Sequence, residues 1–278
     1  NFAVDTICDI LIVAGGGAGG VDNGSGGGGG GVLYATDIQL NGSYNIKVGK
    51  GGLPTTNLDA SYNTTHYSEN GYDSEFGKLG DILVVKGGGY GGNANNSTAE
   101  GTDYPGGDGG SGGGGSYSSN TGGSKVLPTY NSEITANNSE YFGCDGGSEP
   151  GGTTHSSPWY CMGGGGASGN ITTNAHGADG KQINIDGNNY YWGAGGGGTF
   201  FDSTSGNGGK GGGGGGGGDT NENGTGGLLG INNGIDGTAI SNSAGLGGDG
   251  GEHTGGGGGG NSWNAASSGG AGGSGVVI

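Results

Sequence analysis

One segment of the sequence has the residue spacing of a dinucleotide-binding loop. In DILIVAGGGAGG, residues 9–20, an apolar run leads into Gly15, Gly17 and Gly20, which fit the pattern G-x-G-x-x-G. In that chemistry the glycines let the backbone approach a pyrophosphate, which the N-terminus of a following helix binds. The next residues, VDNGSGGGGGG, have no helical periodicity and consist mostly of glycine, which disfavours a helix. Without that helix, we do not expect a nucleotide site.

The same strand-to-glycine segment occurs a second time, which indicates an architectural role. DILVVKGGGYGG, residues 81–92, is identical to the first segment at nine of twelve positions, and again no helical pattern follows. A phosphate loop normally occurs once in a domain, whereas structural units repeat. The nucleophile-elbow pattern G-x-S-x-G at Gly109, Ser111 and Gly113 also lacks the strand and the helix that it needs. We therefore expect no enzymatic activity, no catalytic residue and no cofactor.

One short polar segment has part of the ligand pattern of a calcium loop. Asp219, Asn221 and Asn223 in DTNENG occupy alternating positions from which oxygen atoms can bind calcium, and Gly224 follows for the turn. The twelfth position of such a loop is Gly230, which supplies no bidentate carboxylate. A polar turn is the favoured interpretation, with a weak calcium site as the alternative. The four histidines are scattered, without the spacing of a metal site.

The chain has three cysteines and no C-x-x-C motif, so a zinc knuckle is excluded and a disulfide is the remaining alternative. Cys144 in YFGC and Cys161 in PWYC have similar aromatic flanks and bracket a polar loop that contains proline. We predict a disulfide between these two, because theirs is the most local of the three possible pairings. Cys8 would then remain free or bond between chains.

The sequence contains eight N-x-S/T sequons, of which chance explains about half, and we predict N-glycosylation at them. Asn41 lies at a predicted hairpin tip, and the others lie in polar inserts or at the edges of glycine runs. The alternative is that these asparagines serve only as turn residues. The candidate positions are Asn23, Asn41, Asn63, Asn95, Asn96, Asn137, Asn170 and Asn223.

Glycine accounts for 86 of the 278 residues, and much of it occurs in runs of four to eight. Collagen is excluded, because the chain has five prolines and no strict G-X-Y repeat. In a threefold polyproline-II-like helix these runs would make no internal hydrogen bonds, so each buried N–H and C=O needs a partner in a neighbouring segment. Without side chains, such helices can approach closely enough to bond backbone to backbone. We predict a core made of backbone.

The chain carries 24 acidic residues against 7 lysines and arginines, a formal net charge of −17. Nucleic acid and anionic membranes are therefore poor partners, because both require a cationic surface. The longest aliphatic run, residues 10–14, is far shorter than the roughly 20 residues of a membrane span. We expect neither nucleic-acid binding nor membrane insertion. Because the sequence begins at Asn1 and stops at an apolar Val-Val-Ile, we also expect a processed or incomplete segment.

Conventional secondary structure is limited to short strands, and no segment has a helical pattern. Residues 32–49 predict a hairpin with a type I′ turn at Asn41-Gly42, and residues 182–192 predict another with its turn at Asp186-Gly187. Further strands are expected at 10–13, 82–85 and 276–278. We interpret residues 1–278 as a single glycine-rich domain. Its β portion is mainly 1–95, its glycine-helix portion with polar loops is mainly 96–274, and 275–278 is a closing strand.

Several segments taken together carry a family resemblance that covers nearly the whole chain in order. They are ILIVAGGG, VLYATDIQLNGSYNIKVGKGG, ILVVKGGG, YYWGAGGGG and the closing GGGGGGNSWNAASSGGAGGSGVVI. The chain resembles the glycine-rich domain of phage tail-fibre, algal-virus and secreted surface proteins, and in style the glycine-rich region of anaplastic lymphoma kinase receptors. The resemblance implies packed polyglycine-II helices beside antiparallel β-strands, in a sandwich that resembles a jelly roll, with essentially no α-helix. It implies the fold far better than the function.

The expected function is that of a non-enzymatic, extracellular structural protein, a subunit of a surface or virion fibre that associates with itself or with neighbouring structural subunits. The alternative is a receptor-binding adhesin whose loops, rich in tyrosine and asparagine, recognise a cell-surface glycan or protein. A flexible glycine-rich spacer is the third hypothesis. The aromatic residues expected at an adhesive surface, or capping the ends of the glycine core, are Tyr62, Tyr67, Tyr72, Tyr117, Tyr130 and Trp263.

Overall fold

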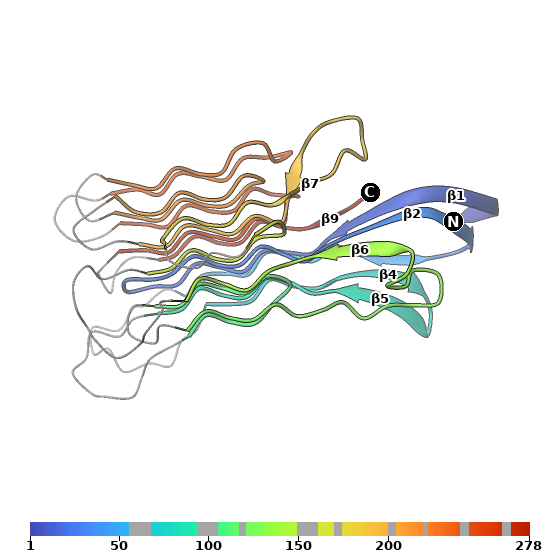
Figure 1. Ribbon diagram of the computed structural model, residues 1–278, viewed down its shortest axis with the longest axis horizontal. Coiled ribbons are helices and arrows are strands. Elements are labelled where there is room, and N and C mark those ends of the chain that lie inside the picture. The colour runs from blue at the N-terminus through green and yellow to red at the C-terminus, as the bar shows by residue number, and fades with distance from the viewer. Residues whose placement is uncertain are drawn as a thin grey trace.

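A computed structural model describes most of the chain (Figure 1). The described residues are 1–55, 68–93, 105–116, 121–148, 161–169, 174–199, 204–218, 222–239, 245–262 and 268–278. Within these ranges the protein is all-β, with no helix, as the sequence predicts. The strands are β1 (Phe2–Val13), β2 (Val32–Gly42), β3 (Asn45–Lys47), β4 (Ser74–Lys78), β5 (Asp81–Val85), β6 (Ser139–Phe142), β7 (Lys181–Gln182), β8 (Tyr191–Trp192) and β9 (Val276–Val277).

The strands form three antiparallel sheets at one end of the molecule. The largest has the order β6-β2-β1-β9, the second the order β3-β4-β5, and β7 pairs with β8 alone. The predicted strands at 10–13, 82–85 and 276–278 correspond to parts of β1, β5 and β9. The predicted hairpin at 182–192 is confirmed, because Lys181 pairs with Trp192 and Gln182 with Tyr191.

The predicted hairpin across Asn41-Gly42 is wrong. β2 ends at Gly42 and β3 begins at Asn45, but β2 pairs with β1 whereas β3 pairs with β4, so the two strands belong to different sheets. Between them, the ring of Tyr44 stacks on Phe76 of the second sheet, with ring centroids 5.1 Å apart. The chain therefore crosses between the sheets at this corner, because packing of an aromatic side chain across the sheets outweighs a local turn preference.

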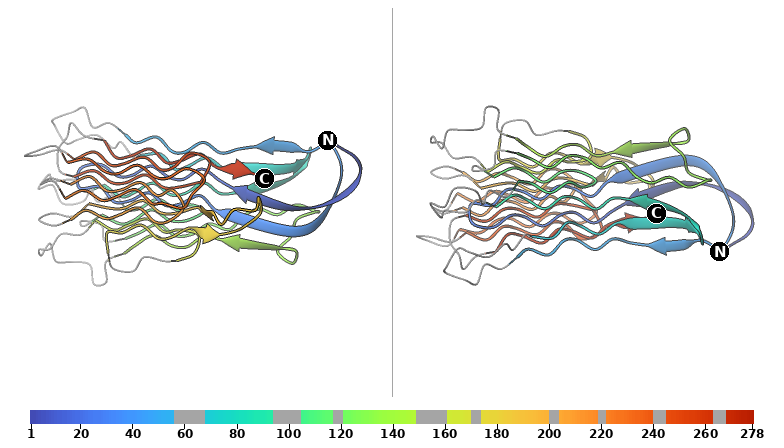
Figure 2. Two further views of the ribbon diagram at one scale, coloured as in Figure 1. Left: turned by 90° about the horizontal axis from the view of Figure 1, so that it is seen from above. Right: turned by 90° about the horizontal axis from the view of Figure 1, so that it is seen from below.

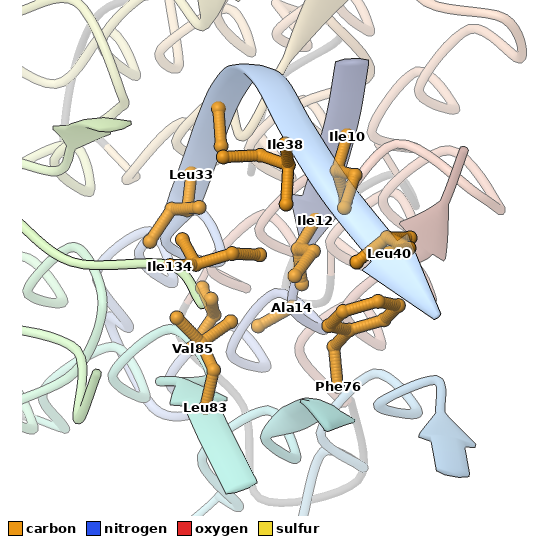
Figure 3. Close-up of a cluster of buried hydrophobic side chains, with 11 residues drawn as sticks. Ile10, Ile12, Ala14, Leu33, Ile38, Leu40, Phe76, Leu83, Val85 and Ile134 are labelled. Carbon is orange, nitrogen blue, oxygen red and sulfur yellow. The ribbon is translucent and has the colours of Figure 1, made fainter. Parts of the chain in front are cut away.

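The two larger sheets face each other and share an apolar core (Figure 3). β1 contributes Ile10 and Ile12 to this core, and successive side chains of a strand point to opposite faces. Leu11 and Val13 consequently pack on the other face of the sheet, in a second cluster with Trp192. Both faces of β1 are covered here, which explains its uninterrupted apolar run. The first cluster consists of Ile10, Ile12, Ala14, Leu33, Ala35, Ile38, Leu40, Phe76, Leu83, Val85 and Ile134.

Beyond the strands, the glycine-rich segments run side by side along the long axis of the molecule (Figures 1 and 2). Within residues 14–20, the backbone N–H groups donate to three neighbours in rotation. Positions 14, 17 and 20 donate to residues 25–31, positions 15 and 18 to residues 69–72, and positions 16 and 19 to residues 270–273, at N···O distances of 2.8–3.1 Å. Each neighbour is therefore met at every third residue.

The neighbouring segments run in both directions. From residues 26–31, one set of bonds reaches residues 162 and 165 in increasing order, and another reaches 258 and 255 in decreasing order. The segments are also too close for side chains. A Cβ atom added at Gly28 would lie 2.3 Å from the carbonyl oxygen of Ser111, and one added at Gly196 would lie 2.1 Å from that of Gly258. The interior of this region is backbone.

Strands and glycine segments both occur in each of the two main predicted portions of the chain. β1 to β5 fall within 1–95 and β9 within 275–278. Glycine segments 14–20 and 87–92 also fall within the first range, and β6, β7 and β8 fall within 96–274. Strands and glycine segments thus alternate along the sequence, and the chain passes repeatedly between the two ends of the molecule.

Replacing Gly196 by alanine tests the backbone core. The added methyl group would overlap the carbonyl of Gly258, and because the three nearest atoms all belong to the backbone of Gly257 and Gly258, no flexible side chain can move aside. We expect destabilisation of about 3 kcal/mol or more, measured by chemical denaturation. Gly169→Ala is the matched control, because its Cβ would meet no atom within 4 Å. Equal stability of the two variants would contradict a close-packed backbone interior.

Candidate functional site

The glycines that suggested a nucleotide site are engaged in the backbone core. The N–H groups of Gly15, Gly17 and Gly20 donate to the carbonyl oxygens of Tyr72, Gly28 and Ser25. These donors are therefore not directed at a phosphate. Ser111, from the G-x-S-x-G pattern, is fully buried and has no access to a substrate.

The calcium candidate falls mostly outside the described residues. Asp219 and Asn221 lie there, whereas Asn223 is described and partly buried. Its Oδ1 atom is buried and has no hydrogen-bond partner among the described residues. Among the described residues there is no group of three or more His, Cys, Asp or Glu side chains that could hold a metal ion.

The predicted disulfide between Cys144 and Cys161 is not formed: all three cysteines are thiols, and the Cys161 Sγ donates to the carbonyl oxygen of Asn23. The segments that carry them run antiparallel: Gly147 N–H donates to Gly163 O, and a Cβ on Gly165 would lie 2.5 Å from the carbonyl of Cys144. In this register Cys161 lies roughly 15 Å along the chain direction from Cys144, at about 3.1 Å per residue. A disulfide needs Cα atoms roughly 4.4–6.8 Å apart. Burial raises the pKa of the Cys144 thiol and favours its protonated form.

Four of the eight sequons lie within the described residues. Asn41 and Asn137 are exposed, whereas Asn23 and Asn223 are partly buried. The Asn41 amide donates to the Asp5 carboxylate. Glycosylation at these positions remains a prediction. The four sequons outside the described residues are Asn63, Asn95, Asn96 and Asn170.

Of the aromatic residues predicted for an adhesive surface, only two lie within the described residues. Tyr72 is half exposed, with a relative accessibility of 50%. Tyr130 instead packs against the apolar core between the sheets. The others, Tyr62, Tyr67, Tyr117 and Trp263, lie outside the described residues.

Aspartate carboxylates along the outside of the glycine-rich region form a feature that the sequence analysis missed. An outer segment lacks a neighbour on its solvent side, and its backbone N–H groups need other acceptors. Six carboxylates accept such bonds at 2.7–2.9 Å, which charge strengthens. The donor and acceptor pairs are Gly87 with Asp73, Ser124 with Asp108, Lys125 with Asp145, Lys210 with Asp179, Gly226 with Asp236, and Ala271 with Asp249.

A local sequence signal marks most of these caps. Every one of the six except Asp73 is followed directly by glycine. Two asparagines with the same successor behave alike: the side-chain oxygen of Asn70 accepts the N–H of Tyr90, and that of Asn207 accepts the N–H of Thr225. Within the glycine-rich region, an aspartate or asparagine before glycine thus recurs at capped N–H groups of outer segments. The negative charge of the chain has a structural use here.

The strand end carries two further carboxylates with backbone partners. Asp81 accepts the N–H of Ser132 at 3.1 Å and also its hydroxyl, and these bonds lower the pKa of Asp81 below its ordinary value. Asp9 accepts the N–H of Asp37 at 3.1 Å. Asp37 has a positive φ of 56° at a β-bulge, where β2 has one residue more than β1.

A surface depression beside this bulge is the candidate binding site. It has a volume of about 390 Å³ and lies between β2 and the end of the turn that leads into β6. Tyr34 on β2 is the cross-strand partner of Glu140 on β6. The Tyr34 hydroxyl donates to Asp9 at 3.2 Å. The lining residues are Tyr34, Thr36, Asn137, Asn138, Ser139 and Glu140, a mixture of one aromatic ring with hydroxyl, amide and carboxylate groups.

The chain matches a known protein family. The sequence model of a family described as a glycine-rich domain matches residues 2–278. The chain therefore belongs to this glycine-rich domain family, as its resemblance indicated. None of the curated proteins matches the sequence. The described part of the chain contains no helix long and apolar enough to cross a membrane.

Removing one carboxylate cap tests its role. Asp249→Ala leaves the N–H of Ala271 without its acceptor, and we expect that amide to exchange its hydrogen faster and the protein to lose about 1 kcal/mol. Asp249→Asn keeps an acceptor oxygen and should restore most of the protection. Glu252→Ala removes an exposed charge that makes no side-chain hydrogen bond among the described residues. If Glu252→Ala loses as much stability as Asp249→Ala, the loss comes from removing a negative charge and not from removing the cap.

Acid should weaken the strand end through Asp81. Because the pKa of Asp81 is lower in the folded protein than its ordinary value of 3.8, the unfolded chain binds more protons in this range. Its contribution to stability is therefore complete above that value and is lost as the pH falls through the folded pKa. We expect Asp81→Asn to lose less stability than the wild type between pH 5 and pH 3, by denaturation at each pH. Identical pH profiles would contradict this assignment.

Proposed function

We propose that this chain is a non-enzymatic structural subunit of an extracellular fibre on a cell or virion surface. The observation that carries the proposal is an open strand edge. β9 pairs with β1 at Ile12 and Val13, with Leu11 bonded to Ile278, so residues 2–10 have no strand on that side among the described residues. An uncovered edge of this length is a site for pairing with another chain.

The side chains of this edge favour association. Val4 and Ile7 are exposed, with relative accessibilities of 71% and 69%. The two acidic residues of the same segment are directed to β2, because Asp5 accepts from Gln39 and Asp9 accepts from Asp37. Their charges therefore form part of the β1–β2 ladder and do not guard the edge. Edges that proteins protect often carry lysine or proline, and residues 2–10 contain neither.

A fibre needs a second contact surface, because one self-complementary contact closes into a dimer. Exposed aliphatic side chains gather in residues 228–246, in the glycine-rich region. Gly234 N–H bonds to Gly227 O, and Thr238 pairs with Leu246, so the described segments on either side of each contact lie next to each other. This second surface consists of Leu228, Leu229, Ile231, Ile235 and Leu246.

A rigid body suits this function, and we infer that the glycine segments are polyglycine-II helices. The support is the threefold rotation of N–H partners described above, since a polyglycine-II helix has three residues per turn and no internal hydrogen bonds. We likewise infer a jelly-roll-like sandwich from the two facing sheets and their common core. A flexible spacer would not have such a continuous network of backbone bonds between segments distant in sequence.

The extracellular location is part of the proposal. Its support is the exposure of the sequons Asn41 and Asn137, where a glycan would remain in solvent. The alternative function, a receptor-binding adhesin, is supported by the depression beside β6 and by the exposed ring of Tyr72.

Lysine substitutions at the β1 edge test the fibre proposal. We expect purified wild-type protein to form concentration-dependent oligomers, and the double variant Val4→Lys, Ile7→Lys to be monomeric, by light scattering coupled to size exclusion. The added charges make pairing of the edge unfavourable but face solvent in the monomer. Leu79→Lys is the control, because this side chain is 94% exposed in the β4–β5 turn, away from the edge.

Two outcomes would contradict the proposal. One is a wild type that stays monomeric at every concentration, with no filament by electron microscopy. The other is oligomers that the double variant forms as readily as the Leu79→Lys control.

A further inference from the structure

We propose that the depression between β2 and β6 binds a neutral sugar. This inference goes beyond the fibre proposal, deepens the alternative function of an adhesin, and does not require the β1 edge. The volume of about 390 Å³ falls within the roughly 300–1,000 Å³ of small-molecule sites and suits one or two sugar rings.

The first argument is that several polar groups lining the depression are free to bind a ligand. The hydroxyl of Thr36, the side-chain amide of Asn137 and the carboxylate of Glu140 make no hydrogen bond with the described residues, and Thr36, Asn137 and Glu140 are exposed. Together they offer a donor and acceptor hydroxyl, an amide with both functions, and a strong acceptor. Adjacent hydroxyl groups of a sugar require this combination of donors and acceptors.

The second argument is that the wall carrying these groups is already held in place. Asn138 accepts the N–H of Thr135 at 2.7 Å and donates to the carbonyl of Glu133 at 2.8 Å. The hydroxyl of Ser139 donates to the carbonyl of Thr135 at 2.6 Å. Bonds within the turn thus use the polar groups of Asn138 and Ser139, and they fix the neighbouring Asn137 and Glu140. A site held in this way loses little entropy when a ligand binds.

The third argument is the aromatic ring beside the carboxylate. Tyr34 and Glu140 are opposite each other on paired strands, and such side chains lie about 5 Å apart at their Cβ atoms. The bond from the Tyr34 hydroxyl to Asp9 fixes the far end of the ring. A sugar ring has one face of C–H groups that packs on an aromatic surface, while its hydroxyls point outward to polar groups. Tyr34 and Glu140 supply both kinds of contact.

Charge restricts the ligand to neutral sugars. Among the described residues that line the depression, Glu140 alone carries a carboxylate or an amine, and the tyrosine hydroxyl is bonded to a second carboxylate, Asp9. The whole chain adds a net charge of −17. A sialylated or phosphorylated sugar would be repelled at this site. A glycan on Asn137 would occupy the same space, so binding in the depression requires that this sequon be unmodified.

The test uses full-length protein made in a host without N-glycosylation, probed on immobilised neutral mono- and disaccharides with sialylated sugars as a charged set. We expect binding to at least one neutral sugar and none to the sialylated set. Glu140→Gln and Asn137→Ala should each weaken binding about tenfold, because each removes hydrogen bonds to the ligand. Neither side chain makes an internal bond in the described part of the chain, so both variants should fold.

Two further variants separate the ring from its anchor. Tyr34→Phe keeps the ring and should retain most of the binding, whereas Tyr34→Ala should abolish it. Tyr72→Ala, at an exposed tyrosine that does not line the depression, is the matched control and should bind like the wild type.

The proposal is overturned if no neutral sugar binds, if the sialylated set binds better, or if Glu140→Gln and Asn137→Ala bind like the wild type. Light scattering on the same samples reports association separately. A monomeric protein that binds sugar contradicts the fibre alone, and an oligomer that binds none contradicts the sugar site alone.

Discussion

Backbone hydrogen bonds between glycine segments are the interaction on which the rest of this structure depends. The N–H of Gly27 donates to Gly258, that of Gly28 to Gly89, and that of Gly29 to Gly165, so three consecutive residues bond to three different parts of the chain. Glycine loses more conformational freedom on folding than any other residue, and close approach of segments on every side is what offsets this loss. The two clusters of buried apolar side chains lie at the strand end, where β1 contributes to one cluster from each of its faces.

In a core made of backbone, the N–H donors that lack a partner are those on its outer surface. Segments inside the bundle satisfy one another, but an outer segment has donors that no neighbour accepts, and the aspartates before glycine supply the missing oxygen atoms. This arrangement connects two properties of the sequence that look unrelated, its abundance of glycine and its acidity. The glycine runs and six of the 24 acidic residues both serve the need of backbone donors for acceptors.

The sequence predicts the parts of the structure that depend on local or repeated patterns. The strands near residues 10–13 and 82–85, the hairpin closed at Asp186-Gly187, the absence of helix from the described residues and the lateral bonding of glycine runs all follow from spacing and composition. The features that it does not predict depend on contacts between distant residues. The turn at Asn41-Gly42 has the local signal of a hairpin, but the stacking of Tyr44 on Phe76 directs the chain into the other sheet.

The same limit applies to the sites. Cys144 and Cys161 look like a pair because their flanking residues are similar, yet the antiparallel register of their segments separates them. The depression beside β6 requires the pairing of Tyr34 with Glu140, more than a hundred residues apart, which no local pattern reveals. By contrast, five of the six aspartate caps share a local feature of the sequence, a glycine directly after the aspartate.

The close approach of the glycine segments also restricts how this protein can evolve. A single-nucleotide change in a glycine codon gives alanine, serine, cysteine, valine, aspartate, glutamate, arginine or tryptophan, and every one of these carries at least a Cβ atom. At positions such as Gly28 or Gly196 that atom has no room. Insertions or deletions of three residues would instead preserve the rotation of bonding partners. We therefore expect relatives of this chain to differ in the length of their glycine segments by multiples of three, while the glycines themselves persist.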